Sequence, residues 1–230
     1  MWVTFERAEM LGANSVIFHF RPEQPLRYIA GQFVELQIPH QTIDERGVSR
    51  MFTLTSLPSE DTVSVAAAFT EPGSTFKRAL QTLKPGARLY MGDPLGDFVL
   101  PKDPSVPMVW MAGGIGAASF VGMAKELTTA AERRTITLFQ SARQHDQLVF
   151  SEHWQLANLT VQQTVTGPDD AWQGHKGRFT ARDLLRAARH PDSTLFYLSG
   201  SEDMVGDVSD ELVFQGLQPA QIVREAFTGY

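Results

Sequence analysis

The chain has 230 residues, of which 43% are hydrophobic and 20% are charged, and its formal net charge is −6. This length suffices for one large domain or two smaller ones, each with its own hydrophobic core. The negative charge and the lack of a basic stripe in the sequence disfavour a nucleic-acid partner. The sequence contains no cysteine, which excludes disulfide bonds, a cysteine-ligated iron–sulfur cluster and thiol catalysis within this chain.

The first residues of the sequence, Met1 to Arg7, contain no charged leader followed by an apolar segment, so we expect no signal peptide. No segment approaches the roughly twenty apolar residues that a membrane-spanning helix needs. These features predict a cytoplasmic protein without direct membrane insertion.

The first hundred residues are typical of short β-strands separated by turns. Such a succession of short strands, with glycine and proline between them, favours an antiparallel barrel or sandwich. One helix is predicted at 75–83, because Phe76, Leu80 and Leu83 fall on one helical face. The predicted strands are 16–20, 33–38, 51–55, 63–69 and 88–91.

After Leu100 the pattern changes to alternating strands and helices. The apolar run at 106–111 is typical of a strand that is covered on both faces, and the alternation indicates a doubly wound parallel sheet. We therefore expect two domains, residues 1–103 and residues 104–230. The other strands predicted in the second domain are 135–139, 159–165, 194–198 and 221–225, and its helices are 120–127, 181–189 and 203–214.

The segment 50–56 carries side chains suited to a flavin. The guanidinium of Arg50 suits a pyrophosphate, the ring of Phe52 suits stacking on an isoalloxazine, and the hydroxyl of Thr53 can hydrogen-bond a flavin ring nitrogen. The segment 73–75, just before the predicted helix, adds backbone amides and hydroxyls where phosphates can bind. Each segment also has a simpler interpretation. Segment 50–56 could be an ordinary amphipathic strand, and segment 73–75 could provide a helix N-cap.

The segment 109–116 is an apolar strand followed by the turn Gly113-Gly114-Ile115-Gly116 and the start of a helix. Glycine lets the backbone approach a ligand closely, and a helix N-terminus favours negative charge. A dinucleotide pyrophosphate fits such a turn, although a glycine-rich sequence by itself is often only a tight turn.

Together these motifs resemble those of the ferredoxin–NADP reductase superfamily, along the whole chain and in the same order. The resemblance implies an N-terminal six-stranded antiparallel β-barrel that binds FAD and a C-terminal α/β domain, with a doubly wound parallel sheet, that binds NADPH or NADH. The segments that carry the resemblance are Gly31-Gln32-Phe33, Arg50 to Thr53, Gly73-Ser74-Thr75-Phe76, Pro85-Gly86, Gly92 to Phe98, Gly113 to Gly116 and Glu225-Ala226-Phe227.

The same resemblance assigns roles around the flavin. Arg50 would hold the flavin pyrophosphate, Phe52 would stack on one face of the ring, and Thr53 would hydrogen-bond flavin N5. Backbone groups of 67–69 would line the ring or the ribityl chain, and 73–76 would cover the pyrophosphate.

The end of the chain also matches the family pattern. Glu225 would sit near the reacting atoms, and Phe227 would cover the flavin face opposite Phe52 and yield to nicotinamide. Tyr230 is a second aromatic candidate for stacking. The simpler interpretation of Phe227 is that it packs on the barrel.

Some positions depart from the family pattern. Ala117 and Ala118 stand where the family usually has threonine and proline, which affects how nicotinamide is positioned. Ser199, in the turn Ser199-Gly200-Ser201, stands where the family has a cysteine near the hydride path. The other interpretation of Ser199 is a strand-end cap.

The nucleotide preference depends on two arginines. Arg143 follows the second predicted strand of the parallel sheet, where this family meets the adenosine end of the dinucleotide, and could pair with a 2′-phosphate. Arg178 is a second candidate, so the sequence slightly favours NADP over NAD. The histidines lack metal-ligand spacing, and no metal site is expected.

The resemblance thus implies an FAD-containing NAD(P)H oxidoreductase, in which hydride passes from nicotinamide to flavin N5 and electrons leave to an acceptor outside the chain. That acceptor could be a ferredoxin, a flavodoxin, an oxygenase component or a small molecule. Two alternatives stay open: an NAD(P)H:flavin reductase with exchangeable flavin, and a flavin-binding electron-transfer or regulatory subunit with impaired nicotinamide use.

The predicted catalytic residues are Thr53, Ser199, Glu225 and Phe227. The predicted cofactor contacts are Arg50, Met51, Phe52, Thr53, Ala67, Ala68, Phe69, Gly73, Ser74, Thr75, Phe76, Gly113, Gly114, Ile115, Gly116, Ala117, Ser141, Arg143, Ser199, Gly200 and Phe227.

Overall fold

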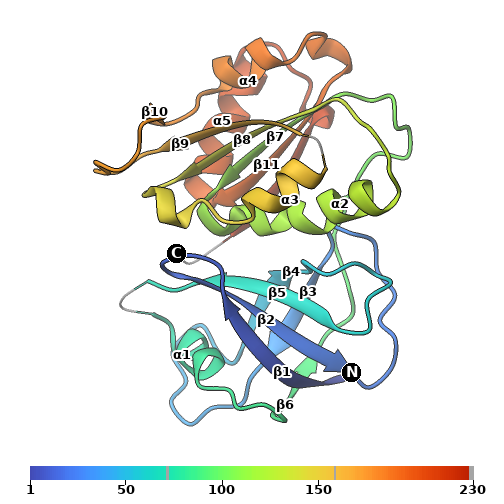
Figure 1. Cartoon of the computed structure of the whole chain (residues 1–230), viewed down its shortest axis with the longest axis vertical. Coiled ribbons are helices and arrows are strands. Elements are labelled where there is room, and N and C mark those ends of the chain that lie inside the picture. The colour runs from blue at the N-terminus through green and yellow to red at the C-terminus, as the bar shows by residue number, and fades with distance from the viewer. Residues whose placement is uncertain (71–72, 158, 228–230) are drawn as a thin grey trace.

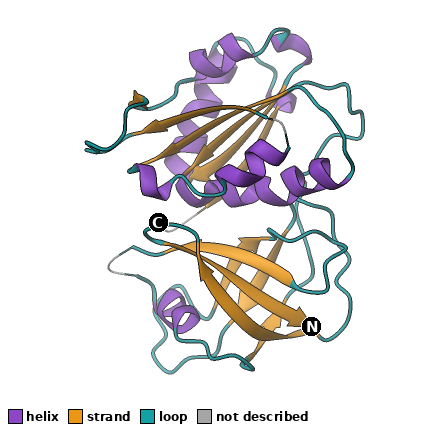
Figure 2. Cartoon of the chain, in the orientation of Figure 1, coloured by secondary structure: helices purple, strands orange, loops and turns teal. Residues whose placement is uncertain are grey.

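The computed structural model describes residues 1–70, 73–157 and 159–227. These residues form two six-stranded sheets, one in each half of the chain (Figure 1). The N-terminal half contains strands, loops and one short helix, whereas several helices flank the second sheet (Figure 2).

The first sheet is antiparallel, with the order β4-β3-β6-β1-β2-β5. Its edge strands β4 and β5 approach each other at an isolated bridge between Leu54 and Val65, and the Thr55 amide donates to the Ser64 carbonyl over 2.8 Å. These contacts close the sheet into a barrel. Its elements are β1 (Trp2–Met10), β2 (Ser15–Pro22), β3 (Phe33–Gln37), β4 (Ser49–Thr53), β5 (Val63–Ala68), the helix α1 (Thr75–Gln81) and β6 (Arg88–Met91).

The second sheet is parallel, with the order β10-β9-β8-β7-β11-β12. Helices α2 and α3 cover the face toward the barrel, and α4 and α5 cover the far face (Figure 1). Its strands are β7 (Met108–Gly113), β8 (Ile136–Ala142), β9 (Thr160–Val165), β10 (His175–Lys176), β11 (Leu195–Ser201) and β12 (Ile222–Phe227). Its α-helices are α2 (Ala118–Thr129), α3 (Ser151–Leu156), α4 (Ala181–Ala187) and α5 (Glu202–Phe214), and short 3-10 helices lie at η1 (Gly114–Ala117), η2 (His145–Gln147), η3 (Pro191–Ser193) and η4 (Pro219–Gln221).

This architecture confirms the predicted fold class, an antiparallel barrel followed by a doubly wound α/β sheet. Each predicted strand and helix is present, β6 with the predicted ends and the others with shifted ends, while β1, β10 and α3 were not predicted. The division of the chain after residue 103 stays a prediction about domain boundaries. No helix within the described ranges is long and apolar enough to cross a membrane.

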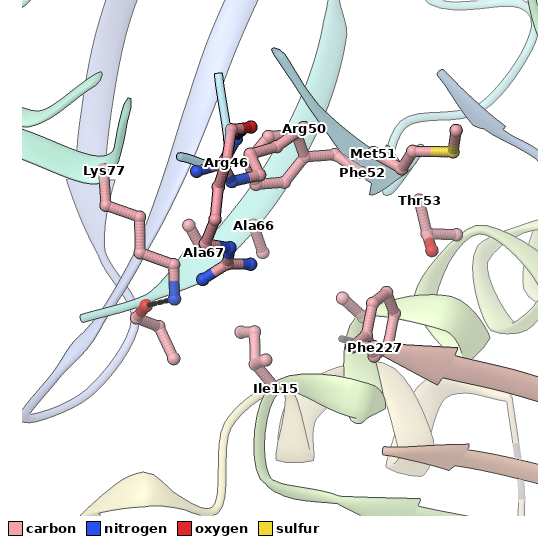
Figure 3. A pocket seen from close by; sticks show the side chains of 12 residues that line it. Arg46, Arg50, Met51, Phe52, Thr53, Ala66, Ala67, Lys77, Ile115 and Phe227 are labelled. Atoms are coloured by element: carbon pink, nitrogen blue, oxygen red, sulfur yellow. Dashed lines mark hydrogen bonds between the residues drawn. The ribbon is translucent and has the colours of Figure 1, made fainter. Parts of the chain in front are cut away.

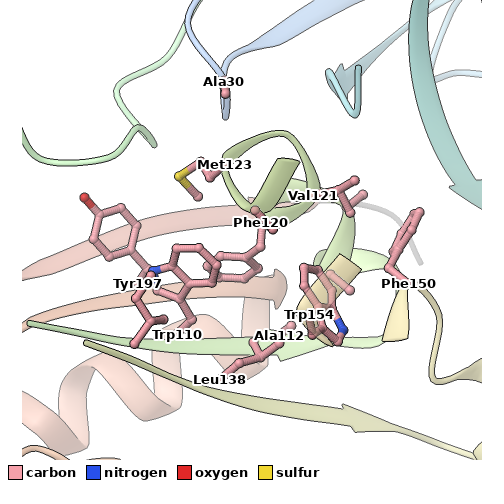
Figure 4. Close-up of a cluster of buried hydrophobic side chains, with 14 of the residues drawn as sticks. Ala30, Trp110, Ala112, Phe120, Val121, Met123, Leu138, Phe150, Trp154 and Tyr197 are labelled. Atoms are coloured by element: carbon pink, nitrogen blue, oxygen red, sulfur yellow. The ribbon is translucent and has the colours of Figure 1, made fainter. Parts of the chain in front are cut away.

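Strand β7 explains how the parallel sheet is covered on both faces. Trp110 points to the α2 side, where its ring stacks on Phe120 with 4.9 Å between centroids (Figure 4). Val109 and Met111 point to the α4 and α5 side. The cluster on the α2 side also contains Ala30 of the barrel half, so the two halves pack against each other.

The strand order creates a switch point beside β7. From β7 the chain proceeds to β8 and β9 on one side and to β11 and β12 on the other. Ligands of such sheets bind at the carboxyl ends of the strands beside this point. Here those ends carry the glycine turn that follows β7, the turn after Ser199, and Glu225.

Candidate active site at the domain interface

A short hydrogen bond joins the two halves of the molecule at the predicted site. Thr53, the last residue of β4, donates from Oγ1 to Oε1 of Glu225 on β12 over 2.7 Å. Thr53 is only 3% exposed. Two residues that lie 172 positions apart in the sequence and were both predicted as catalytic are therefore in direct contact.

Two serines extend this contact into a buried network. The Oγ atoms of Ser119 and Ser199 lie 2.9 Å apart, and the Oγ atom of Ser119 lies 3.4 Å from Oγ1 of Thr53. Ser199, which was predicted, and Ser119, which was not, are both fully buried. A Cβ atom on Gly116 would lie 2.5 Å from the Ser199 carbonyl oxygen, so glycine is needed there to let the two segments approach.

Glu225 has an unusual electrostatic environment. Its burial raises the pKa of the carboxyl above the ordinary value of 4.5, and hydrogen bonds from Ser119 and Thr53 act in the opposite direction. Oε2 of this carboxyl is buried and has no hydrogen-bond partner among the described residues. Burial thus favours the protonated form, and one oxygen remains available to a bound group.

A cavity opens beside this network, between the barrel and the glycine turn (Figure 3). Its volume is about 80 Å³, well below the roughly 300–1,000 Å³ of typical small-molecule pockets. A flavin ring would therefore have to move side chains aside. The lining residues predicted from sequence are Arg50, Met51, Phe52, Thr53, Ala67, Ala68, Ile115 and Phe227; those not predicted as contacts are Arg46, Ala66, Lys77 and Ala118.

Arg50 is already engaged with groups of its own chain. Nη1 donates to the carbonyl oxygens of Arg46 and Ser49, each over 2.6 Å. Nη2 lies 3.5 Å from Oδ1 of Asp44, but it is buried and makes no hydrogen bond to the described residues. The guanidinium group thus keeps one donor nitrogen for an additional anion.

Asp44 places a carboxylate where the sequence predicts a pyrophosphate. Oδ2 accepts a hydrogen bond of 2.8 Å from the backbone amide of Thr75 at the start of α1, and the Asp44 amide donates to the Thr75 hydroxyl over 3.2 Å. The bond from the Thr75 amide lowers the pKa of Asp44 to about 2. A phosphate that binds between Arg50 and Thr75 must therefore compete with an internal anion.

Several predicted contacts around α1 have a structural function here. Ser74 is the N-cap of α1 and accepts from the Lys77 amide over 3.2 Å, which is the N-cap interpretation. Phe76 is in the barrel core and stacks on Phe52 with 5.9 Å between centroids, and Phe69 packs edge-on against Phe18. Ser74, Phe76, Phe69 and Gly73 are not among the described residues that line the cavity. Their contact with a flavin stays a prediction.

A second, much larger cavity of about 770 Å³ lies at the carboxyl ends of β7, β8 and β11. Ala68 and Ile115 line both cavities and thus mark where they adjoin. The lining residues predicted as contacts are Ala68, Gly114, Ile115, Ser141 and Arg143, with Arg178 as the second arginine considered. Those not predicted include Asn14, Ser15 and Thr70 of the barrel half, Thr166 and Thr180, and Asp203, Met204, Asp207 and Glu211 on α5.

The remaining predicted residues fall into two groups. Phe227, the last residue of β12, lines the first cavity and is partly buried, whereas Tyr230 lies outside the described residues. Gly113 packs against Met204, where a Cβ atom would lie 2.5 Å from Sδ. Gly113, Gly116 and Ala117 belong to the turn after β7, and Gly200 belongs to the turn after Ser199. None of these four is among the described residues that line either cavity.

Two of the unpredicted residues, Ser119 and Asp44, are joined to the site by contacts between distant segments. Ser119 stands among apolar residues in the first turn of α2, and a serine in an otherwise buried helix is the sequence signal that could have pointed to it. Asp44 is in a loop and gave no local signal. No group of three metal-ligating side chains occurs in the described part of the chain.

Sequence and structure comparisons agree with this geometry. Residues 110–210 match a family model described as the oxidoreductase NAD-binding domain. The chain is 30% identical over 167 residues to the reductase component of phenol 2-monooxygenase from Pseudomonas sp. strain CF600, covering 69% of this chain and 46% of that protein. It is 27% identical over 210 residues to the electron transfer component of toluate 1,2-dioxygenase from Pseudomonas putida, covering 88% of this chain and 59% of that protein. The chain thus spans about half the length of these curated relatives.

Two solved structures have the same fold. A ferredoxin NADP+ reductase from Neisseria gonorrhoeae with bound FAD and NADP superimposes with a TM-score of 0.81 at 20% identity and covers 98% of both chains. A cytochrome P450 reductase from Amycolatopsis gives a TM-score of 0.81 at 23% identity and covers 99% of this chain and 69% of its own.

Proposed function

This chain belongs to the ferredoxin–NADP reductase superfamily, and from that premise we propose that it is an FAD-containing NAD(P)H oxidoreductase that passes electrons to an external acceptor. The observation that carries the proposal is the Thr53–Glu225 hydrogen bond. It places a barrel hydroxyl and a buried carboxyl of the α/β half together beside the cavity that contains Ile115 and Phe227.

The first cavity fits a flavin in its chemistry. Nη2 of Arg50 is a buried donor without a hydrogen-bond partner among the described residues, as expected of a group that binds a phosphate. Three consecutive alanines, 66–68, line the cavity, and larger side chains there would fill the space that a planar ring needs. Arg50 would hold the pyrophosphate, and Phe52 and Phe227 would contact the ring.

The second cavity fits a dinucleotide. Its volume of about 770 Å³ lies within the range of small-molecule sites. Gly114 and Ile115 of the glycine turn line it, just before α2 begins. Arg143 and Arg178 are exposed and form no ion pair among the described residues, so either can bind a phosphate without breaking a bond. This supports NADPH as a substrate alongside NADH.

The residues between the cavities would orient the reaction. A bound flavin would supply hydride acceptance from nicotinamide and one-electron transfer to the acceptor. Thr53 offers a hydroxyl and Glu225 a carboxyl at the junction, and burial keeps that carboxyl protonated at a higher pH than usual. Phe227 shields the first cavity, and nicotinamide would have to displace its ring.

The acceptor is proposed by analogy with the relatives. These are a monooxygenase reductase component and a dioxygenase electron transfer component, so an oxygenase component or a small electron carrier is the first candidate for this chain. Because the sequence has no cysteine, a cysteine-ligated iron–sulfur cluster must belong to another polypeptide segment or protein. A cytoplasmic location and a domain boundary near residue 103 stay predictions.

The test is a combined cofactor and reduction assay. The protein is purified gently, its flavin is extracted and identified by chromatography, and the loaded protein is mixed anaerobically with NADH or NADPH in a stopped-flow instrument. We expect FAD and rapid bleaching of the flavin absorbance. FMN as the bound flavin, or no reduction by either nucleotide, would contradict the proposal; absent reduction would favour the regulatory-subunit alternative.

One observation favours a second function, an NAD(P)H:flavin reductase with exchangeable flavin. Asp44 competes for Arg50 and for the Thr75 amide, which weakens retention through the pyrophosphate. Desalting separates the two functions: a protein that stays yellow retains its flavin, whereas one that becomes colourless and turns over added riboflavin or FMN is a flavin reductase.

A further inference from the structure

We infer that Ser119 is a positioning residue, whose hydroxyl joins Thr53 and Ser199 into one network and thereby fixes the Glu225 carboxyl at the domain interface. The catalytic consequence rests on the proposed oxidoreductase function. The network itself does not, because it consists only of side chains of this chain.

The first argument is the position of Ser119 between two close contacts of the backbone. Three residues before it, Gly116 approaches the carbonyl of Ser199, where a Cβ atom would lie 2.5 Å from the oxygen. Three residues after it, Gly122 approaches the carbonyl of Leu54, where a Cβ atom would lie 3.2 Å from the oxygen. Residues three apart share a helix face, so the start of α2 contacts both β11 and the barrel next to the Ser119 side chain.

The second argument is the distribution of hydrogen bonds. Ser119 lies between Ser199, at 2.9 Å, and Thr53, at 3.4 Å. A hydroxyl has one hydrogen to donate, and Thr53 donates its hydrogen to Glu225. Ser119 is the hydrogen-bond partner of the buried Ser199 hydroxyl among the described residues, so Ser199 would be left unsatisfied without it.

The third argument concerns the carboxyl. Thr53 on β4 donates to Glu225, and Ser119 on α2 lies 3.4 Å from the Thr53 hydroxyl. Burial raises the pKa of the Glu225 carboxyl, and hydrogen bonds from Ser119 and Thr53 oppose that rise. Ser199 on β11 is the strand partner of Glu225 in the parallel register. Hydroxyl groups thus oppose the effect of burial on this carboxyl, and we expect the removal of one of them to shift its protonation equilibrium.

The experiment compares Ser119→Ala with wild type by carbon-13 NMR titration of labelled glutamate carboxyls in the full chain as purified, with Glu225→Gln identifying the resonance. Ser119→Ala should move the titration midpoint of Glu225 upward, because a hydrogen bond to the charged form is lost. Ser119→Thr, which keeps a hydroxyl, should restore it. Thr194→Val is the matched control: Thr194 is 1% exposed and precedes β11 at the end opposite Ser199, and its hydroxyl bonds to the His190 carbonyl.

Flavin reduction gives the second readout. In stopped-flow experiments with NADH or NADPH, Ser119→Ala should slow reduction on the order of tenfold and displace its pH profile, with little change in the control. An unchanged Glu225 midpoint, or equal effects in Ser119→Ala and Thr194→Val, would overturn the inference. If Ser119→Ala does not fold, Ser199→Ala tests the same network from its other end. A shifted midpoint in a protein that neither nucleotide reduces would support the network and contradict the proposed function.

Discussion

The two cavities differ in whether the arginines that line them already bind other groups of the chain. In the barrel cavity, of about 80 Å³, Arg50 bonds to backbone carbonyls and faces Asp44 at 3.5 Å. In the α/β cavity, of about 770 Å³, Arg143 and Arg178 line the wall without an ion pair among the described residues. A ligand of the first must replace internal contacts, whereas a ligand of the second can enter an existing space.

This difference follows from how each cavity is formed. The barrel cavity lies against strands β4 and β5, and a loop that carries Asp44 folds back onto the start of α1. The α/β cavity forms where the strand order reverses, which leaves a crevice without any rearrangement. We therefore expect flavin binding to involve reorganisation and dinucleotide binding to involve little.

The largest effect is expected from Arg50→Ala. Loss of a charge-assisted contact to the pyrophosphate should weaken FAD binding by about 100-fold, or about 3 kcal/mol, measured by fluorescence titration. Arg21→Ala is the control, since Arg21 pairs with Glu6 on the outer surface of the barrel. Equal FAD affinities in the two variants would remove Arg50 from the flavin site.

Arg143→Ala tests the open cavity. If this arginine binds the 2′-phosphate, the variant should weaken NADPH by about 1–3 kcal/mol and leave NADH nearly unchanged. Arg178→Ala is the matched comparison, because both arginines line the same cavity. The apparent affinities come from stopped-flow reduction at varied nucleotide concentrations, and equal changes for both nucleotides would argue against a 2′-phosphate contact.

Phe227→Ala tests whether the aromatic side chain closes the barrel cavity. If its ring occupies the position that nicotinamide needs, the variant should bind NAD(P)+ severalfold more tightly, and its turnover could fall through slow product release. A purely structural phenylalanine would instead lower stability by about 3–5 kcal/mol without tighter binding. Titration with NAD(P)+ and the melting temperature together distinguish these results.

Asp44→Asn tests whether the internal anion weakens flavin binding. Without the competing charge, FAD affinity should increase by no more than about fivefold, and retention on desalting should improve. Asp93→Asn, at an exposed loop position just after β6, serves as the charge-matched control. A decrease in affinity would show that Asp44 supports the bound state instead.

Among the effects on stability rather than on binding, Glu225→Gln should give a small one. The folded carboxyl has a pKa raised above its ordinary value of 4.5, so its contribution to stability is present below that pH and is lost as the pH rises through the raised value. The variant should match wild type near pH 4 and melt about 2–4 °C higher near pH 8. A melting difference that is independent of pH would show that the carboxyl does not titrate in this way.

Much of the fold was predictable because periodicity records which faces are buried. Strand β6 was located at its observed ends, and β7 was identified from its continuous apolar run. Strand β1 was missed because its second half, from Arg7 to Met10, is exposed and gives no apolar alternation. Helix α3 has only six residues and starts after Phe150, whose φ of 67° is left-handed, so the sequence offered neither length nor a standard cap.

The site was predictable where a motif coincides with a strand end, and unpredictable where function depends on distant partners. Thr53 and Glu225 were identified in this way, and the structure brings them together. Ser119 and Asp44 matter because of contacts with segments that are far away in the sequence. Ser119 contacts Ser199, 80 residues away, and Asp44 contacts Thr75, 31 residues away. No local pattern contains that information.

Strand β12 lies at the border of its sheet and pairs only with β11 among the described strands. It also contributes both Glu225 and Phe227. Border strands are bonded on one side and open more readily than central strands, with free energies well below that of global unfolding. We therefore expect the assembled site to open by local fraying of this strand, and a ligand that contacts Glu225 or Phe227 to slow amide exchange along it.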